Sequence, residues 1–223
     1  MPLDWMRSPV KIPSIPAIKT GLVDVCEFLA ENFKPAEEMG DMGSALLIDA
    51  MEIWESQKRK RVAEMKVLAI MYEIGSFAGE SAEVFASYFK TVHCVDPWID
   101  PCGAPSIELV ENSFDERAAK AGNMIKHKAT SEEEAARVLD GSLDFCYIDA
   151  GNHSYERTLI DIRLWYPKVR PGGFFGGHDW EIPDLHAADV FPGVARAFRE
   201  FFGPVEPVPV IFRDTSWLVR VPA

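Results

Sequence analysis

The chain has 223 residues, of which 35 are acidic and 23 are basic, so its formal net charge at pH 7 is −12. A chain this acidic is repelled by phosphate backbones and anionic lipids, which excludes nucleic acid and membranes as general partners. Its hydrophobic share of 48% and charged share of 26% are those of a globular protein. No uncharged stretch approaches the roughly 20 residues of a membrane-spanning helix, so we expect one soluble α/β domain with an extension.

The first 65 residues are predicted to form a helical extension. Residues 1–20 contain several prolines and are expected to be extended. Residues 21–33 carry apolar side chains at helical spacing, and a second helical pattern begins at Ser44. The N-terminus lacks the continuous apolar segment of a signal peptide, and the four cysteines form no CxxC pair. Free buried thiols and a cytoplasmic location are therefore predicted.

From Lys66 onward, short apolar runs alternate with amphipathic segments, a pattern typical of βαβ units. Strands are predicted at residues 67–74, 91–95, 124–128, 143–148, 173–177, 208–213 and 217–221. Helices are predicted between them at residues 80–89, 106–121, 131–139, 155–165 and 194–202. Only a short turn at residues 214–216 separates the last two strands, which predicts an antiparallel hairpin at one edge of an otherwise parallel sheet.

The strongest local motif is YEIGSFAGES at residues 72–81, where a strand meets a helix. Its loop residues Gly75, Ser76, Phe77 and Gly79 are expected to bind a cofactor, since glycine lets a backbone approach a ligand closely. Two glycines do not complete the G-x-G-x-x-G pattern of dinucleotide-binding folds. Glu73 would repel a pyrophosphate but would attract the cationic amino acid part of S-adenosylmethionine. The motif therefore favours S-adenosylmethionine over a dinucleotide.

Asp96 ends the second predicted strand, 23 residues after Glu73. This is close to the spacing at which an acidic residue accepts hydrogen bonds from ribose hydroxyls. Trp98 follows in a proline-rich loop, and two roles are equally supported for its indole. It either flanks the nucleoside or packs within the loop.

These features resemble a class I S-adenosylmethionine-dependent methyltransferase, with E-x-G-x-x-x-G after the first strand, an acid after the second and a terminal hairpin. The stretch DFCYIDAGNHSYERTLIDIRLWYPKVRPGGFFGGHDW at residues 144–180 is similar to the class 24, cephalosporin hydroxylase-like small-molecule O-methyltransferases, relatives of the macrocin and catechol O-methyltransferases. The resemblance covers residues 66–221. It implies a Rossmann-like sheet of order 3-2-1-4-5-7-6 with strand 7 antiparallel, helices on both faces, and a methyltransferase domain at residues 66–223.

The resemblance also implies a set of site residues at the carboxyl ends of the strands. Thr130 and Ser131 stand where this fold often contacts adenine, although Ser131 also begins a capped acidic helical turn. Asp149 is placed as a cofactor and catalytic residue. Together with His178 and Asp179 it would reach one crevice at the switch point of the sheet. Such a trio suits Mg²⁺ or another divalent metal, and the histidine favours Mn²⁺, Fe²⁺ or Zn²⁺.

Each of these assignments has a structural alternative. His178 could bond a loop, and Asp179 could cap the segment that follows it. His153 is the candidate general base, because methyl transfer to oxygen requires removal of the hydroxyl proton. One more residue separates Asp149 from His153 than in the D-G-x-H pattern of the family, which could rotate the imidazole off the reacting oxygen. The alternative makes His153 a neighbour of a helix cap at Ser154.

The sequence thus predicts an S-adenosylmethionine-dependent O-methyltransferase whose acceptor is a small-molecule hydroxyl, such as a sugar, a polyol or a secondary metabolite. Residues 1–65 would lie across the carboxyl edge of the sheet as a lid, or join a second copy in a homodimer. Two alternatives stay open: a non-catalytic S-adenosylmethionine-binding module and a nucleotide-dependent oxidoreductase.

Overall fold

The computed structural model describes residues 15–32, 59–60, 62–66, 69–99, 107–150, 154–180, 192–203 and 207–223. The predicted helix beginning at Ser44 lies outside these residues. Among the helices that are described, none is both long enough and apolar enough to cross a membrane.

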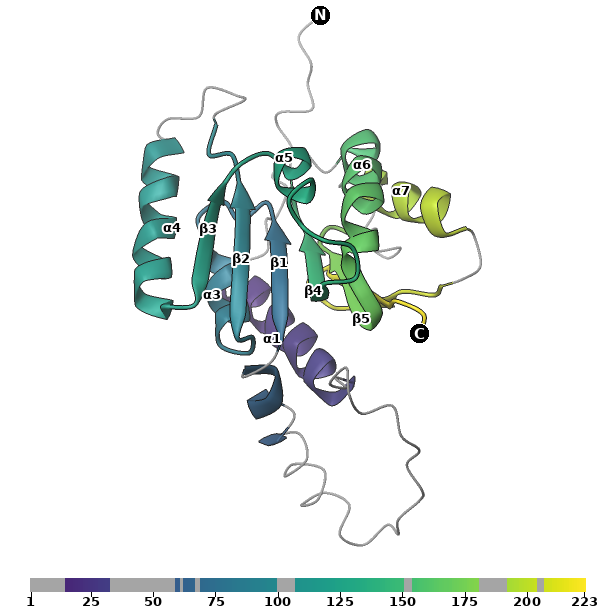
Figure 1. Cartoon of the computed structure of the whole chain (residues 1–223), viewed down its shortest axis with the longest axis horizontal. Coiled ribbons are helices and arrows are strands. Elements are labelled where there is room, and N and C mark those ends of the chain that lie inside the picture. The colour runs from purple at the N-terminus through teal and green to yellow at the C-terminus, as the bar shows by residue number, and fades with distance from the viewer. Residues whose placement is uncertain are drawn as a thin grey trace, which may run out of the picture.

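The described strands form one seven-stranded sheet of order β3-β2-β1-β4-β5-β7-β6, which confirms the predicted topology (Figure 1). In chain order the strands are β1 (Ile70–Ile74), β2 (Thr91–Asp96), β3 (Met124–Lys128), β4 (Leu143–Ile148), β5 (Val169–Gly177), β6 (Val210–Ile211) and β7 (Trp217–Arg220). The first five pair in parallel with their neighbours. Strand β7 runs antiparallel to both β5 and β6, as expected for a terminal hairpin.

Helices cover both faces of this sheet. One face carries α1 (Ile15–Asn32), α3 (Glu80–Ala86) and α4 (Ile107–Ala121). The other carries α5 (Ser131–Ala135), α6 (Tyr155–Trp165) and α7 (Pro192–Phe202), and a short 3₁₀ helix, η2 (Tyr166–Lys168), links α6 to β5. All parallel strands therefore end at one edge, which Figure 1 shows at the top of the sheet.

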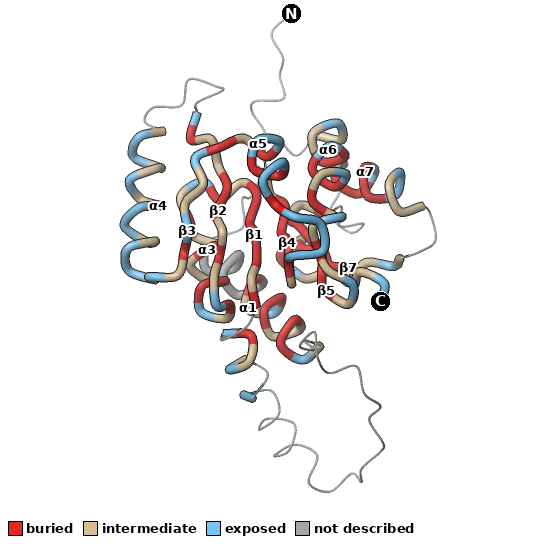
Figure 2. The backbone as a smooth tube through the Cα atoms, in the orientation of Figure 1, coloured by how far each residue is buried: buried red, intermediate tan, exposed pale blue. Residues whose placement is uncertain are grey.

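Successive side chains of the central strands point to opposite faces of the sheet, so each strand contributes to two hydrophobic cores. In β1, Met71 points to the α3 face and Tyr72 and Ile74 point to the α6 face; in β4, Tyr147 and Cys146 divide in the same way. Figure 2 shows the buried strands between these helical layers. Sheets covered on both faces need nearly continuous apolar strands, which explains the strand signal in the sequence. The predicted free thiols at residues 26, 94 and 146 are confirmed as buried and unpaired, and Cys102 lies outside the described residues.

Some predicted boundaries were wrong, for reasons that lie in proline chemistry. Helix α1 begins at Ile15, inside the segment expected to be extended, because Pro16 occupies the first turn, where its missing N–H costs nothing. Strand β6 has only two residues, because Pro207 and Pro209 cannot donate ladder hydrogen bonds.

The described part of the N-terminal extension packs against the sheet. Leu22, Val25, Cys26, Leu29 and Ala30 of α1 are all buried in the core of the α3 face. Phe28 meets the rings of two residues from the other end of the chain, Phe174 at 6.1 Å and Phe212 at 5.8 Å. Helix α1 is therefore part of the core, while a lid or dimerisation role for residues 1–65 stays a prediction.

Candidate active site

The turn after β1 owes its shape to two glycines. Gly75 has φ +93°, and a Cβ there would lie 2.2 Å from the carbonyl oxygen of Asp149. The turn is therefore packed tightly on the end of β4. Gly79 has φ +80° as the N-cap of α3, and a Cβ there would lie 2.9 Å from the ring of Phe114. Larger residues would strain both positions, and the buried Ser76 lies between them.

Asp96 ties this turn to the loop that follows β2. Its carboxylate accepts hydrogen bonds from the backbone N–H of Phe77 at 3.0 Å and from that of Trp98 at 2.7 Å. Burial raises the pKa of Asp96, and these two amides oppose the rise. Since an ionised carboxylate offers about four lone-pair sites, it retains capacity to accept from ribose hydroxyls.

Trp98 is placed for packing. The indole is 3% exposed and packs on the ring of Phe114 at 4.8 Å, with the ammonium of Lys126 over its face. Its Nε1 donates to the carbonyl of Phe77 at 2.9 Å. Trp98 is also not one of the described residues that line the neighbouring cavity. The structure therefore favours the packing alternative over a nucleoside contact, whereas the side chain of Phe77 is exposed at the loop.

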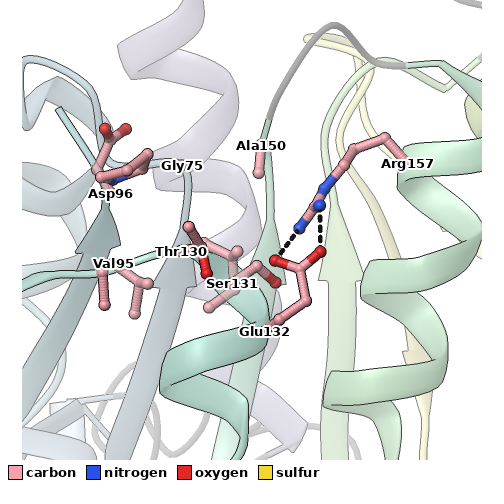
Figure 3. Close-up of a pocket in the computed structure, with 11 residues that line it drawn as sticks. Gly75, Val95, Asp96, Thr130, Ser131, Glu132, Ala150 and Arg157 are labelled. Atoms are coloured by element: carbon pink, nitrogen blue, oxygen red, sulfur yellow. Dashed lines mark hydrogen bonds and ion pairs between the residues drawn. The ribbon is translucent and has the colours of Figure 1, made fainter. Parts of the chain in front are cut away.

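A cavity of about 240 Å³ opens at the carboxyl ends of β1, β2 and β3 (Figure 3). It is smaller than the roughly 300–1,000 Å³ of typical ligand pockets, so it suits part of a cofactor. Its described lining consists of Ile74, Gly75, Val95, Asp96, Pro97, Ala129, Thr130, Ser131, Glu132, Ala150 and Arg157. Four predicted cofactor residues, Gly75, Asp96, Thr130 and Ser131, thus meet at one cavity.

Thr130 and Ser131 also carry structural hydrogen bonds. Thr130 is the N-cap of α5 and forms a capping box with Glu133. The hydroxyl of Ser131 donates to Asp161 at 2.5 Å and accepts from Nε1 of Trp165 at 2.8 Å. The capped acidic turn predicted from the sequence is therefore explained by the start of α5 alone. Contacts of Thr130 and Ser131 with adenine stay a prediction.

Glu73 is fully buried beneath the β1 turn. Within the part of the chain that the structure describes, no hydrogen bond of normal geometry reaches either of its carboxylate oxygens, although the hydroxyls of Ser76 and Ser81 lie nearby. Burial raises the pKa of Glu73 to about 7, and the nearby charges of Asp149 and Asp96 add to the rise, which the hydroxyls of Ser81 and Ser76 oppose. Leaving a buried carboxylate without partners is costly, so this site is suited to a cationic ligand group.

The second group of predicted residues does come together. Asp149, His178 and Asp179 each offer one ligand atom, and these atoms lie within 4.8 Å of one another. Nδ1 of His178 is 2.9 Å from Oδ1 of Asp179, while the buried Nε2 has no partner among the described residues. Asp179 holds a left-handed backbone conformation with φ 61°, which aspartate tolerates better than most residues.

The pKa of His178 is unusually high for a histidine. Burial lowers the pKa of His178, but the hydrogen bond to Asp179 and the charges of Asp149, Asp179 and Asp214 outweigh it and raise the pKa to about 9. Several carboxylates thus surround an imidazole whose Nε2 has no hydrogen-bond partner in the described structure. The donor set of two carboxylates and one imidazole fits a divalent cation.

Comparison with known proteins identifies this arrangement. Residues 72–180 match a family described as a methyltransferase domain. This stretch includes the β1 turn, all of the described cavity lining and the trio of Asp149, His178 and Asp179. Residues 72–180 therefore form a methyltransferase domain of that family. Curated protein sequences give no match to this chain.

Two solved structures share the fold of the methyltransferase. One is a Klebsiella pneumoniae protein provisionally named an O-methyltransferase, with 18% identity, a TM-score of 0.53, and coverage of 96% of this chain and 93% of that chain. The other is an O-methyltransferase from Bacillus cereus in complex with SAH, with 16% identity, a TM-score of 0.50, and coverage of 99% and 96%. At these identities the likeness shows the fold alone.

Two features of the methyltransferase site lie beyond the sequence predictions. The β6–β7 turn adds a buried carboxylate, Asp214, which accepts hydrogen bonds from the N–H and hydroxyl of Ser216; that hydroxyl is also 2.7 Å from the hydroxyl of Tyr147. The sequence showed only a turn there. Glu132 and Arg157 join the cavity lining because of how α5 and α6 pack, which no local motif reports. The candidate base His153 lies outside the described residues.

Proposed function

We propose that this methyltransferase transfers the methyl group of S-adenosylmethionine to a hydroxyl oxygen of a small molecule, with a divalent metal at Asp149, His178 and Asp179. The observation that carries the proposal is the half-buried trio, in which Nε2 of His178 has no partner among the described residues; the trio adjoins the cavity, whose lining includes Ala150, the neighbour of Asp149. The carboxyl edge of the sheet then has two halves: a cofactor half, which is the cavity beside β1, β2 and β3, and an acceptor half, which is the trio beside β4 and β5.

The cofactor half is suited to a nucleoside joined to a cationic amino acid. Asp96, which lines the cavity, would accept hydrogen bonds from the ribose hydroxyls. Glu73 would pair with the α-ammonium group, which would supply partners for its two carboxylate oxygens. The β1 turn, packed on β4 through Gly75, would hold the sulfonium toward the neighbouring trio.

The acceptor half is suited to a hydroxyl group. When bound, a divalent cation supplies Lewis acidity that lowers the pKa of a coordinated hydroxyl. Asp149, His178 and Asp179 would hold it and orient the acceptor oxygen for in-line attack on the methyl carbon. His153 is proposed to accept the hydroxyl proton. The acceptor is proposed to be a sugar, a polyol or a secondary metabolite, and a homodimer is proposed as the assembly.

The test is methyl transfer to a panel of hydroxyl-bearing small molecules, followed by release of S-adenosylhomocysteine. We expect EDTA to abolish methyl transfer by the wild type and added Mg²⁺ or Mn²⁺ to restore it. In Asp179→Ala, the added metal should not restore methyl transfer. Glu116→Ala, an exposed change on α4, is the matched control. Transfer that persists in EDTA would remove the metal from the proposal, and transfer to amines alone would replace O-methylation by N-methylation.

A further inference from the structure

One wall of the cavity is an ion pair that closes it opposite Asp96 (Figure 3). Arg157 lies in the first turn of α6, and Glu132 lies in the first turn of α5. Nη1 of Arg157 donates to Oε1 of Glu132 at 2.5 Å, and Nη2 donates to Oε2 at 3.2 Å. This two-pronged pairing fixes the guanidinium plane as well as its position.

A second carboxylate anchors the same guanidinium. Asp161, one turn further along α6, is 1% exposed and accepts from Nε of Arg157 at 3.2 Å and from Nη2 at 2.9 Å. Asp161 is itself held by the hydroxyl of Ser131. Burial lowers the pKa of Arg157, but Glu132 and Asp161 outweigh it and leave the pKa raised. The guanidinium of Arg157 at this wall of the cavity is thus held in one orientation by the carboxylates of Glu132 and Asp161.

The hydrogen bonds of Arg157 to Glu132 and Asp161 leave one of its N–H groups without an acceptor in the described chain. A guanidinium has five N–H donors, and within the described chain one of the two on Nη1 is not used. Adenine ring nitrogens are acceptors with exposed lone pairs, and a planar guanidinium whose orientation is already fixed loses little entropy when it bonds one. The position of Asp96 at the opposite side of the cavity leaves the Arg157 side for the base.

We propose that Arg157 contacts the adenine ring of the cofactor and donates its remaining Nη1–H to one ring nitrogen. Arg157 is then a specificity-determining residue of the cofactor site, and Asp161 is its positioning residue. The inference rests on the proposed placement of the S-adenosylmethionine ribose at Asp96. It adds a cofactor contact from α6, beyond those predicted after β1, β2 and β3.

The experiment is calorimetric binding of S-adenosylhomocysteine and of its 1-deaza, 3-deaza and 7-deaza analogues, each of which lacks one ring nitrogen. We expect the wild type to bind one analogue about fivefold more weakly than the parent, as loss of one hydrogen bond predicts. Arg157→Met should bind the parent about fivefold more weakly and show no deficit for that analogue. Its KM for S-adenosylmethionine should rise while kcat at saturation stays unchanged.

Arg163→Met is the matched control, because Arg163 lies on the same helix, is exposed and pairs only weakly with Glu200 at 3.8 Å. It should behave as the wild type does. Arg157→Lys keeps the charge but not the planar donor set, so it should lose the discrimination too, and it serves if Arg157→Met fails to fold by circular dichroism. A wild type that binds all analogues equally, or a deficit that persists in both variants, would overturn the inference. No binding of S-adenosylhomocysteine to the wild type would instead refute the proposed function.

Discussion

The described residues of this methyltransferase include two clusters of histidine and carboxylate, which differ in whether a buried nitrogen is left without a hydrogen-bond partner. One is the His178 trio at the carboxyl edge. The other lies between the sheet and α5, where Nδ1 of His127 is 2.9 Å from the buried carboxylate of Glu134 and Nε2 of His127 is 2.9 Å from Nδ1 of His93. The ring of His93 is stacked on Tyr72 at 4.3 Å.

The difference separates a structural cluster from a functional one. A carboxylate only accepts hydrogen bonds, so Nδ1 of a neutral His127 donates to Glu134 and its Nε2 accepts from His93. Burial lowers the pKa values of both histidines, that of His93 to about 4, which keeps both imidazoles neutral. In the trio, by contrast, Nε2 of His178 has no partner in the described structure and its pKa is raised to about 9. An incomplete, charged cluster at the sheet edge is ready for a ligand.

The largest effect should separate the clusters by activity. His178→Ala is expected to lower kcat at least about 100-fold, because it removes a proposed ligand of the metal that activates the acceptor hydroxyl. His93→Phe preserves the stacking on Tyr72 and should change kcat less than about twofold. Both are measured as S-adenosylhomocysteine release per folded molecule, with folding checked by circular dichroism. Equal losses in the two variants would erase the distinction.

The next effect should separate them by stability. Glu134→Ala leaves His127 and Arg137 without their buried carboxylate partner, and the expected loss in free energy of unfolding is about 1–3 kcal/mol. Urea denaturation measures it, with Glu116→Ala as the control. Because Glu134 lies away from the reacting groups, kcat should be retained. A large loss of kcat with unchanged unfolding would assign this cluster to catalysis.

Glu73 extends the comparison to a third buried group. Glu73→Gln should weaken S-adenosylhomocysteine binding about tenfold, since it removes the charge-assisted partner of the ammonium. The pKa of Glu73 is raised to about 7, so wild-type affinity should fall as pH drops below 7 and the carboxylate is protonated. Titration calorimetry between pH 6 and 8 measures both effects, with Glu80→Gln on α3 as the control. A pH profile that is the same in Glu73→Gln would count against this role.

The smallest effect is a pH dependence of stability from the complete cluster. The pKa of His93 is lowered from 6.5 to about 4, so the unfolded chain takes up a proton that the folded chain refuses. Stability from this site is therefore full above pH 6.5 and is lost as pH falls toward 4. Thermal melts of the wild type should drop over this range more steeply than those of His93→Phe. Parallel curves would show that His93 does not set the slope.

The sequence predicted the sheet because strand signals are local. Buried runs such as residues 143–148 alternate between two cores and stand out from the helices between them. It also placed Asp96, Asp149 and His178 at strand ends, where topology alone brings them to one edge. The sequence could not decide between the two roles of Trp98, because the direction of its indole depends on the positive φ of Trp98 itself. It could not find Arg157 either, because its place in the cavity follows from how two helices pack.

Helix α1 has a consequence for how the chain is made. Its aromatic contact, Phe28, rests on Phe174 and Phe212, which leave the ribosome much later. At roughly 5–20 residues per second, the 146 residues from Phe28 to Phe174 take about 7–30 s to synthesise. For that time Phe28 lacks both of its aromatic partners, whereas α3, which α1 also contacts, has already been made. Helix α1 can therefore dock on α3 early in synthesis, and its packing is completed at Phe28 only after most of the chain has been made.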